Sequence, residues 1–103
     1  MKYDVIVSDE AHNDIDNVLN YIVNLLKNPI AAKNLLGKIE ESYVDLADNP
    51  FMYAHCHNSR LHNDGYRKVV INNYVLIYRI DEAKNFVYVV RFFYGRQNYI
   101  ELI

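Results

Sequence analysis

The spacing of apolar residues changes halfway along the chain. Between residues 8 and 48 they recur every three or four positions, which is the spacing of a helix with one buried face. Between residues 66 and 94, β-branched and aromatic residues dominate short runs bounded by polar turns, as they do in strands. Residues 2–7 also alternate in the strand pattern. The pattern predicts a strand, two helices and three further strands.

Both helices have recognisable ends. Ser8 is suited to cap the first helix, and two acidic residues follow it in the first turn, where the helix dipole favours carboxylates. We expect this helix to end near Lys27. Asn28-Pro29 then supplies a cap and a proline at the first helical position, and Asn49-Pro50 ends the second helix. So short a connection predicts an antiparallel helical hairpin.

Three strands are predicted over residues 66–71, 74–80 and 86–94. Asn72-Asn73 separates the first two, and because asparagines tolerate positive φ, we expect a tight hairpin there. The predicted fold class is α+β, with a single domain over residues 1–103. In it, an N-terminal strand and an antiparallel helical hairpin pack with an antiparallel β-sheet that ends in a three-stranded C-terminal meander. We expect both helices on one face of the sheet.

The Asn72-Asn73 turn determines which residues share a face of the sheet. With these two as the turn residues, Arg67 lies opposite Tyr78 on one face, and Lys68 and Arg79 point to the other. Arg67 and Arg79 therefore leave the sheet on opposite sides near the same end. Because the helices cover one face only, one arginine is predicted to serve a site and the other to lie at the rim of the helix layer.

Composition and charge indicate a small globular protein with unevenly distributed charge. Apolar residues make up 51% and charged residues 23% of the chain. We expect neither a membrane span nor a signal peptide, and the single cysteine, Cys56, fits a cytoplasmic protein. Residues 1–50 carry four Lys and nine Asp or Glu, whereas residues 51–103 carry seven Lys or Arg and four Asp or Glu. This asymmetry predicts a positive face that attracts nucleic acid or an acidic peptide.

Candidates for a functional site lie in the second half of the chain. His55-Cys56-His57 lacks the further ligands that a structural zinc site requires, so we expect an ordinary loop, no metal and no other cofactor. Arginine suits phosphate because its guanidinium donates two parallel hydrogen bonds and stays charged. The candidate site residues, as contacts to phosphate or to a macromolecular target, are Arg67, Arg91, Arg96 and Tyr99. The alternative role of the arginines is to form salt bridges with the acidic helices.

The order of elements and several short motifs resemble the RelE/ParE superfamily of toxins from type II toxin–antitoxin systems. The matching motifs are Asn28-Pro29 with Ala31-Ala32, residues 46–50, Gly65-Tyr66-Arg67, residues 74–81, and Val90-Arg91 leading to Tyr94-Gly95-Arg96. The resemblance implies this fold over nearly the whole chain. It also implies a toxin that a cognate antitoxin protein holds inactive by wrapping the domain and covering its positive face.

The resemblance leaves the toxic activity open. Similarity to the ParE branch implies inhibition of DNA gyrase by binding. Similarity to the RelE branch implies a metal-independent endoribonuclease that cleaves mRNA on the ribosome, with Arg67, Arg91 and Arg96 contacting phosphate and Tyr99 assisting proton transfer. An inactive, antitoxin-binding module is a further alternative.

Individual positions distinguish the two branches. Val75 stands where RNA-cleaving relatives usually carry an essential arginine, and Tyr94 stands where many have histidine. Arg96 and Tyr99 are similar to the C-terminal arginine and tyrosine of the RNA-cleaving branch. The two departures, together with the net charge of −2, favour gyrase inhibition.

Overall fold

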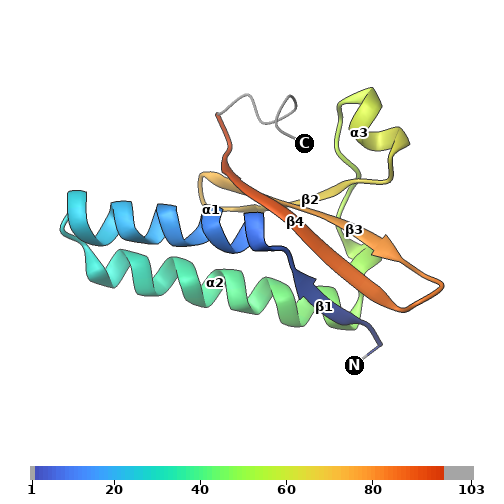
Figure 1. Ribbon diagram of the computed structural model, residues 1–103, viewed down its shortest axis with the longest axis horizontal. Coiled ribbons are helices and arrows are strands. Elements are labelled where there is room, and N and C mark those ends of the chain that lie inside the picture. The colour runs from blue at the N-terminus through green and yellow to red at the C-terminus, as the bar shows by residue number, and fades with distance from the viewer. Residues whose placement is uncertain (1, 97–103) are drawn as a thin grey trace.

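The computed structural model describes residues 2–96 of the chain. Figure 1 shows a helical hairpin along one face of a twisted sheet and a short helix, α3, on the other side. The elements in chain order are β1 (Asp4–Val7), α1 (Asp9–Asn20), the π-helical turn η1 (Tyr21–Leu25), α2 (Pro29–Asp48), the 3-10 turn η2 (Pro50–Met52), α3 (Ser59–Asn63), β2 (Arg67–Ile71), β3 (Tyr74–Asp81) and β4 (Phe86–Tyr94). Among the described residues, no helix has the length and apolar character to cross a membrane.

The described strands form one sheet in the order β1-β4-β3-β2. The predicted meander is confirmed, because β2, β3 and β4 pair antiparallel in turn. The predicted register is confirmed as well, with Arg67 opposite Tyr78 and with Asn72 at a positive φ of 54°. The expectation of a wholly antiparallel sheet is wrong for β1, which pairs parallel to β4. The connection between this parallel pair is long, because the chain passes through the helical hairpin, α3, β2 and β3 before it returns as β4 beside β1.

Both predicted helix caps are present. The Ser8 hydroxyl accepts a hydrogen bond from the backbone N–H of Ala11 at 3.1 Å, and the Asn28 side chain accepts one from the N–H of Ala31 at 3.1 Å. The first helix stops at the predicted place, because Lys27 takes a φ of 53° in the left-handed region. Its last turn is π-helical over Tyr21–Leu25, a widening that the apolar spacing does not predict.

The main core fills the space between the hairpin and the sheet. From α2 it takes Leu35, Ile39 and Leu46, and from the sheet Leu76, Tyr78, Val87, Val89 and Phe92, each at most 2% exposed. The Tyr78 hydroxyl donates a hydrogen bond to the backbone carbonyl of Pro50 at 2.6 Å. Burial raises the pKa of Tyr78, so this phenol stays protonated and keeps donating.

A second, smaller cluster covers the opposite face of the sheet. Its buried members are Cys56, Leu61, Val75, Ile77 and Phe93. The segment before β2 is held against the sheet by backbone hydrogen bonds, from the Cys56 N–H to the Tyr66 carbonyl at 3.0 Å and from the Lys68 N–H to the Ala54 carbonyl at 3.3 Å. The expectation of an ordinary exposed loop around His55-Cys56-His57 is therefore wrong for Cys56, which is 2% exposed.

We predict that Tyr78→Phe lowers the free energy of unfolding by about 1–2 kcal/mol, because the Pro50 carbonyl loses its buried donor. Urea denaturation followed by circular dichroism measures the change. Tyr88→Phe is the matched control, since Tyr88 is only partly buried on β4. Equal stabilities of the two variants would show that the Tyr78 hydrogen bond contributes nothing net.

Candidate functional site

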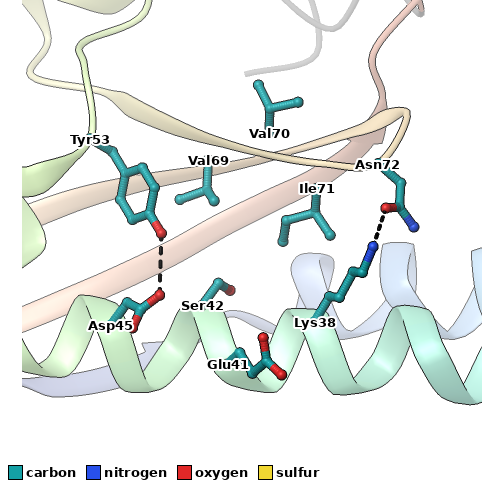
Figure 2. A pocket seen from close by; sticks show the side chains of 9 residues that line it. All are labelled: Lys38, Glu41, Ser42, Asp45, Tyr53, Val69, Val70, Ile71 and Asn72. Carbon is teal, nitrogen blue, oxygen red and sulfur yellow. Dashed lines mark hydrogen bonds between the residues drawn. The ribbon is translucent and has the colours of Figure 1, made fainter.

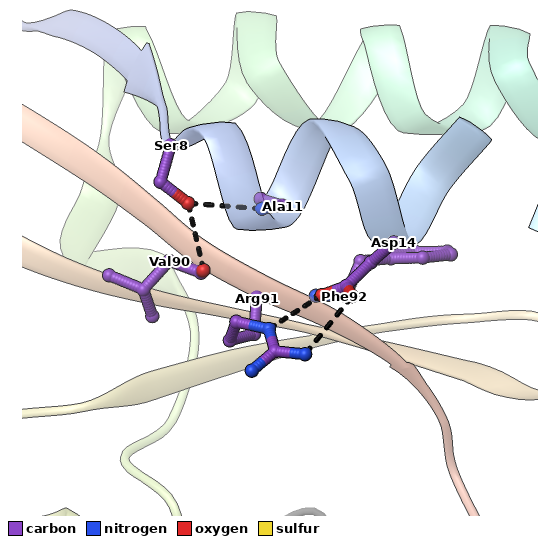
Figure 3. A network of polar contacts seen from close by, with 6 residues as sticks. All are labelled: Ser8, Ala11, Asp14, Val90, Arg91 and Phe92. Atoms are coloured by element: carbon purple, nitrogen blue, oxygen red, sulfur yellow. Dashed lines mark hydrogen bonds and ion pairs between the residues drawn. The ribbon is translucent and has the colours of Figure 1, made fainter. Parts of the chain in front are cut away.

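Among the described strands, the C-terminal part of β4, from Val90 onward, pairs with β3 on one side only. On the side where β1 pairs with the first half of β4, the start of α1 lies against this part of the strand. β1 ends at Val7, which pairs with Val89. Beyond that point the Ser8 hydroxyl donates to the Val90 carbonyl at 2.9 Å, and the Asp14 carboxylate accepts from the Phe92 N–H at 3.0 Å (Figure 3). Side chains of the first helix therefore satisfy the backbone groups that a further strand would pair.

Arg91 belongs to the same network. Its Nε lies 2.8 Å from one Asp14 carboxylate oxygen, and its Nη2 lies 3.1 Å from the other, which is the bidentate geometry that arginine favours (Figure 3). Its guanidinium also lies 4.5 Å from the centre of the Phe93 ring. The hydrogen bonds to Asp14 raise the pKa of Arg91. We call the contacts among Ser8, Asp14, Val90, Arg91 and Phe92 the edge network.

Arg67 lies on the face that the helical hairpin covers. Its guanidinium donates to the Tyr53 carbonyl and lies 5.4 Å from the centre of the Phe51 ring. Arg79 lies on the other face, 5.3 Å from the centre of the Tyr66 ring, and its side chain is exposed. The prediction that Arg67 and Arg79 leave the sheet on opposite faces is confirmed: Arg67 lies on the face that the hairpin covers, and Arg79 lies on the other face.

Arg96 follows the end of β4 and is exposed. It lines a groove of about 290 Å³ together with Val70, Asn72, Asn73, Tyr74, Val75 and Gly95. The Gly95 N–H donates to the Asn73 carbonyl at 2.7 Å, and a Cβ at Gly95 would lie 3.1 Å from that carbonyl oxygen. This close approach fixes the direction in which the chain leaves the sheet. Tyr99, the fourth candidate residue, lies outside the described residues.

The candidate arginines do not share one pocket. Arg67 begins β2, whereas the Arg96 groove is formed at the other end of that strand, where Val70 and the following turn line it, about 10 Å or more away at the rise of a β-strand. Four basic residues instead share the face away from the hairpin, namely Lys68, Arg79, Arg91 and Arg96. We call this surface the basic face. The predicted hairpin register had already placed Lys68 and Arg79 on it, although neither was chosen as a site residue.

Two of the four histidines, His55 and His62, lie together at the Arg67 end of β2. The rings of His55 and His62 stack with centres 4.6 Å apart, and His55 forms a β-bridge with Arg67. Burial, followed by the charges of Arg67 and His62, lowers the pKa of His55. Burial raises the pKa of Cys56, so its thiol is a poor nucleophile at neutral pH. Within residues 2–96, no three His, Cys, Asp or Glu side chains are grouped to hold a metal ion.

A polar groove separates the outer edge of β2 from α2. Figure 2 shows Val69 and Ile71 pointing toward α2 and Val70 pointing away. Two hydrogen bonds cross the groove, from the Lys38 Nζ to Asn72 at 2.8 Å and from the Tyr53 hydroxyl to Asp45 at 3.4 Å. The groove has a volume of about 250 Å³. These contacts hold the sheet edge to the helix, and the basic face remains the better candidate for a functional surface.

A family model described as the ParE toxin of the type II toxin–antitoxin system parDE matches residues 5–99. The chain therefore belongs to the ParE toxin family, and the resemblance to the RelE/ParE superfamily is confirmed. No curated protein of similar sequence was found.

Two solved structures have a similar fold. A chain of the chromosomal ParDE toxin–antitoxin system from P. aeruginosa superposes with a TM-score of 0.70 at 15% sequence identity, covering 90% of this chain and 96% of its own. A chain of the toxin–antitoxin complex RelBE2 from Mycobacterium tuberculosis superposes with a TM-score of 0.64 at 19% identity, covering 91% and 99%. The predicted α+β fold class is confirmed, and both branches of the superfamily share it with this chain.

We predict that Asp14→Ala destabilises the protein by about 2–3 kcal/mol, because it removes the acceptor of the Phe92 N–H and the carboxylate that forms the bidentate contact with Arg91. Asp16→Ala, an exposed acidic residue on the same helix, should change stability by no more than about 0.5 kcal/mol. Urea denaturation of the two variants measures the difference. If Asp14→Ala were as stable as Asp16→Ala, the edge network would have no structural role.

Proposed function

We propose that this chain is a toxin that poisons DNA gyrase by binding it and that a cognate antitoxin protein neutralises in the cytoplasm. The toxin class rests on the family membership. The choice of a binding mechanism rests on one observation, the apolar and buried Val75 at the position where RNA-cleaving relatives usually carry an essential arginine. The proposal therefore has the chain act as an inhibitor and not as a hydrolase.

Cleavage of RNA through its 2′-hydroxyl requires a base for that proton, cations around the developing phosphorane and an acid for the leaving oxygen. Of the described residues that line the Arg96 groove, Arg96 and Tyr74 are titratable. Burial, followed by the neighbouring Tyr94 and Tyr21, raises the pKa of Tyr74, which keeps its phenol protonated at neutral pH. Val75, at the position of the essential arginine in RNA-cleaving relatives, is 6% exposed in the second cluster.

The basic face suits binding to an acidic partner. Arg79 and Arg96 are exposed on it, whereas the two long helices carry an excess of acidic residues on the opposite side of the sheet. Such a division of charge orients an approaching acidic surface, whether protein or DNA, toward the basic face. An antitoxin segment that covers this face would block the same surface. Both similar solved structures are described as toxin–antitoxin systems, which supports an antitoxin as the partner.

One observation favours the second candidate function, cleavage of mRNA on the ribosome. His55, whose pKa is lowered, lies beside His62 and Arg67, so a neutral imidazole and a guanidinium are available together. A neutral imidazole is a competent general base. This cluster lies at the opposite end of β2 from Arg96, so the two functions assign the activity to different ends of the molecule.

Growth of cells that express the chain without an antitoxin tests the toxin class and locates the activity. We predict growth arrest by the wild-type chain and at least partial relief by Arg96→Ala, because Arg96 is the exposed arginine of the groove. His55→Ala should still arrest growth. Lys84→Ala, in the exposed turn between β3 and β4, is the matched control for loss of one positive charge.

The pattern of relief separates the alternatives. If His55→Ala and Arg67→Ala relieved the growth arrest while Arg96→Ala still arrested growth, the toxic activity would lie at the His55–His62 cluster. That result would favour RNA cleavage. Growth without arrest by the wild-type chain at a confirmed expression level would identify an inactive, antitoxin-binding module. Circular dichroism of each purified variant establishes that relief does not come from unfolding.

A further inference from the structure

Gly37 lies in the middle of α2, where the structure gives no internal reason for a glycine. Glycine is the poorest helix former after proline. A Cβ built on Gly37 would meet nothing within 4 Å, so the residue is not required for packing inside this chain. Its φ also lies outside the left-handed region that favours glycine. A glycine in this setting is explained when another backbone approaches the helix closely.

The surface around Gly37 faces directly away from the core. Ile30 and Val44 lie seven residues before and after it, hence on the same side of the helix, and they are 73% and 56% exposed. Lys33 and Glu41 lie four residues before and after it and are exposed on the two flanks of that side, Glu41 also lining the groove beside β2. The buried residues of α2, among them Leu35, Ile39 and Leu46, lie on the opposite side of the helix.

These positions are arranged symmetrically about Gly37. At equal distances on its two sides, an apolar residue matches an apolar residue and a lysine matches a glutamate. We propose that α2 binds a second copy of this chain, with the two α2 helices antiparallel and crossing at Gly37. A two-fold axis at Gly37 brings Ile30 of one copy to Val44 of the partner copy and Lys33 to Glu41 of the partner copy, each contact occurring twice. A parallel arrangement would place lysine against lysine and glutamate against glutamate, so the charges specify the antiparallel one.

The interface is small, which determines how the association behaves. One helix crossing with two apolar pairs and two ion pairs covers much less than the roughly 800 Å² per partner of a standard protein interface. The dimer is therefore in reversible equilibrium with the monomer and is weakened by salt. The basic face lies on the other side of the sheet and stays accessible in the dimer.

Sedimentation velocity of the purified full chain over a range of concentrations tests the proposal. We expect a concentration-dependent shift from monomer to dimer. Lys33→Glu and Glu41→Lys should each raise the dimer dissociation constant by roughly tenfold or more, because each places like charges opposite one another. The double variant, which exchanges the two charges, should restore the wild-type constant. Lys84→Glu changes the net charge by the same amount as Lys33→Glu but lies outside the interface, so it should leave the constant unchanged.

Substitution of Gly37 gives an independent test, because it should change the stability of the fold and the stability of the dimer in opposite directions. Gly37→Ala should raise the midpoint of thermal unfolding at low concentration, because alanine favours the helix, and should weaken the dimer. Gly37→Leu should abolish the dimer while the monomer stays folded. The proposal is overturned by a monomer at every concentration, by a double charge variant no better than the single ones, or by a Gly37→Leu chain that still dimerises. None of these results depends on toxicity, so the proposed function is tested separately.

Discussion

The bidentate contact between Asp14 and Arg91 is the interaction on which the rest of the structure depends. It joins residues 77 positions apart and closes the outer edge of β4 where β1 has ended. Because the same carboxylate accepts from the Phe92 N–H, it fixes the position of α1 along the strand as well as the arginine. The helical hairpin is thereby attached to the sheet by polar contacts at this edge and by apolar packing over the sheet face.

This contact also constrains the function. A guanidinium whose donors are held by a half-buried carboxylate is poorly placed to bind phosphate, so Arg91 serves the fold first. Of the basic face, Arg79 and Arg96 are the residues exposed to a partner. Val75 is buried in the second cluster together with Leu61 of α3, and it also lines the groove beside Arg96, where we propose that a partner binds. At the other end of β2, the imidazole of His55 lies near Arg67.

Much of the fold followed from local signals. Ser8, Asn28 and the Asn72-Asn73 turn are short-range features whose chemistry determines helix starts and hairpin register without tertiary information. Three features depended on distant contacts. The parallel pairing of β1 with β4 could not be predicted, because the two strands are far apart in the sequence. The burial of Cys56 and Leu61 depends on their contact with the face of the sheet away from the hairpin, which local sequence does not indicate. Asp14 is one of several acidic residues on α1, and nothing in its neighbours marks it as the partner of Arg91.

Under the proposed function, the protein acts by binding gyrase and not by cutting RNA. The most direct measurement incubates the purified chain with gyrase and supercoiled DNA and, in parallel, with translating ribosomes, and then maps breaks in the DNA and in the message. We predict gyrase-linked DNA breaks that Arg96→Ala reduces, and an intact message. Codon-specific message breaks in the ribosome reaction, with no effect on gyrase, would contradict this account.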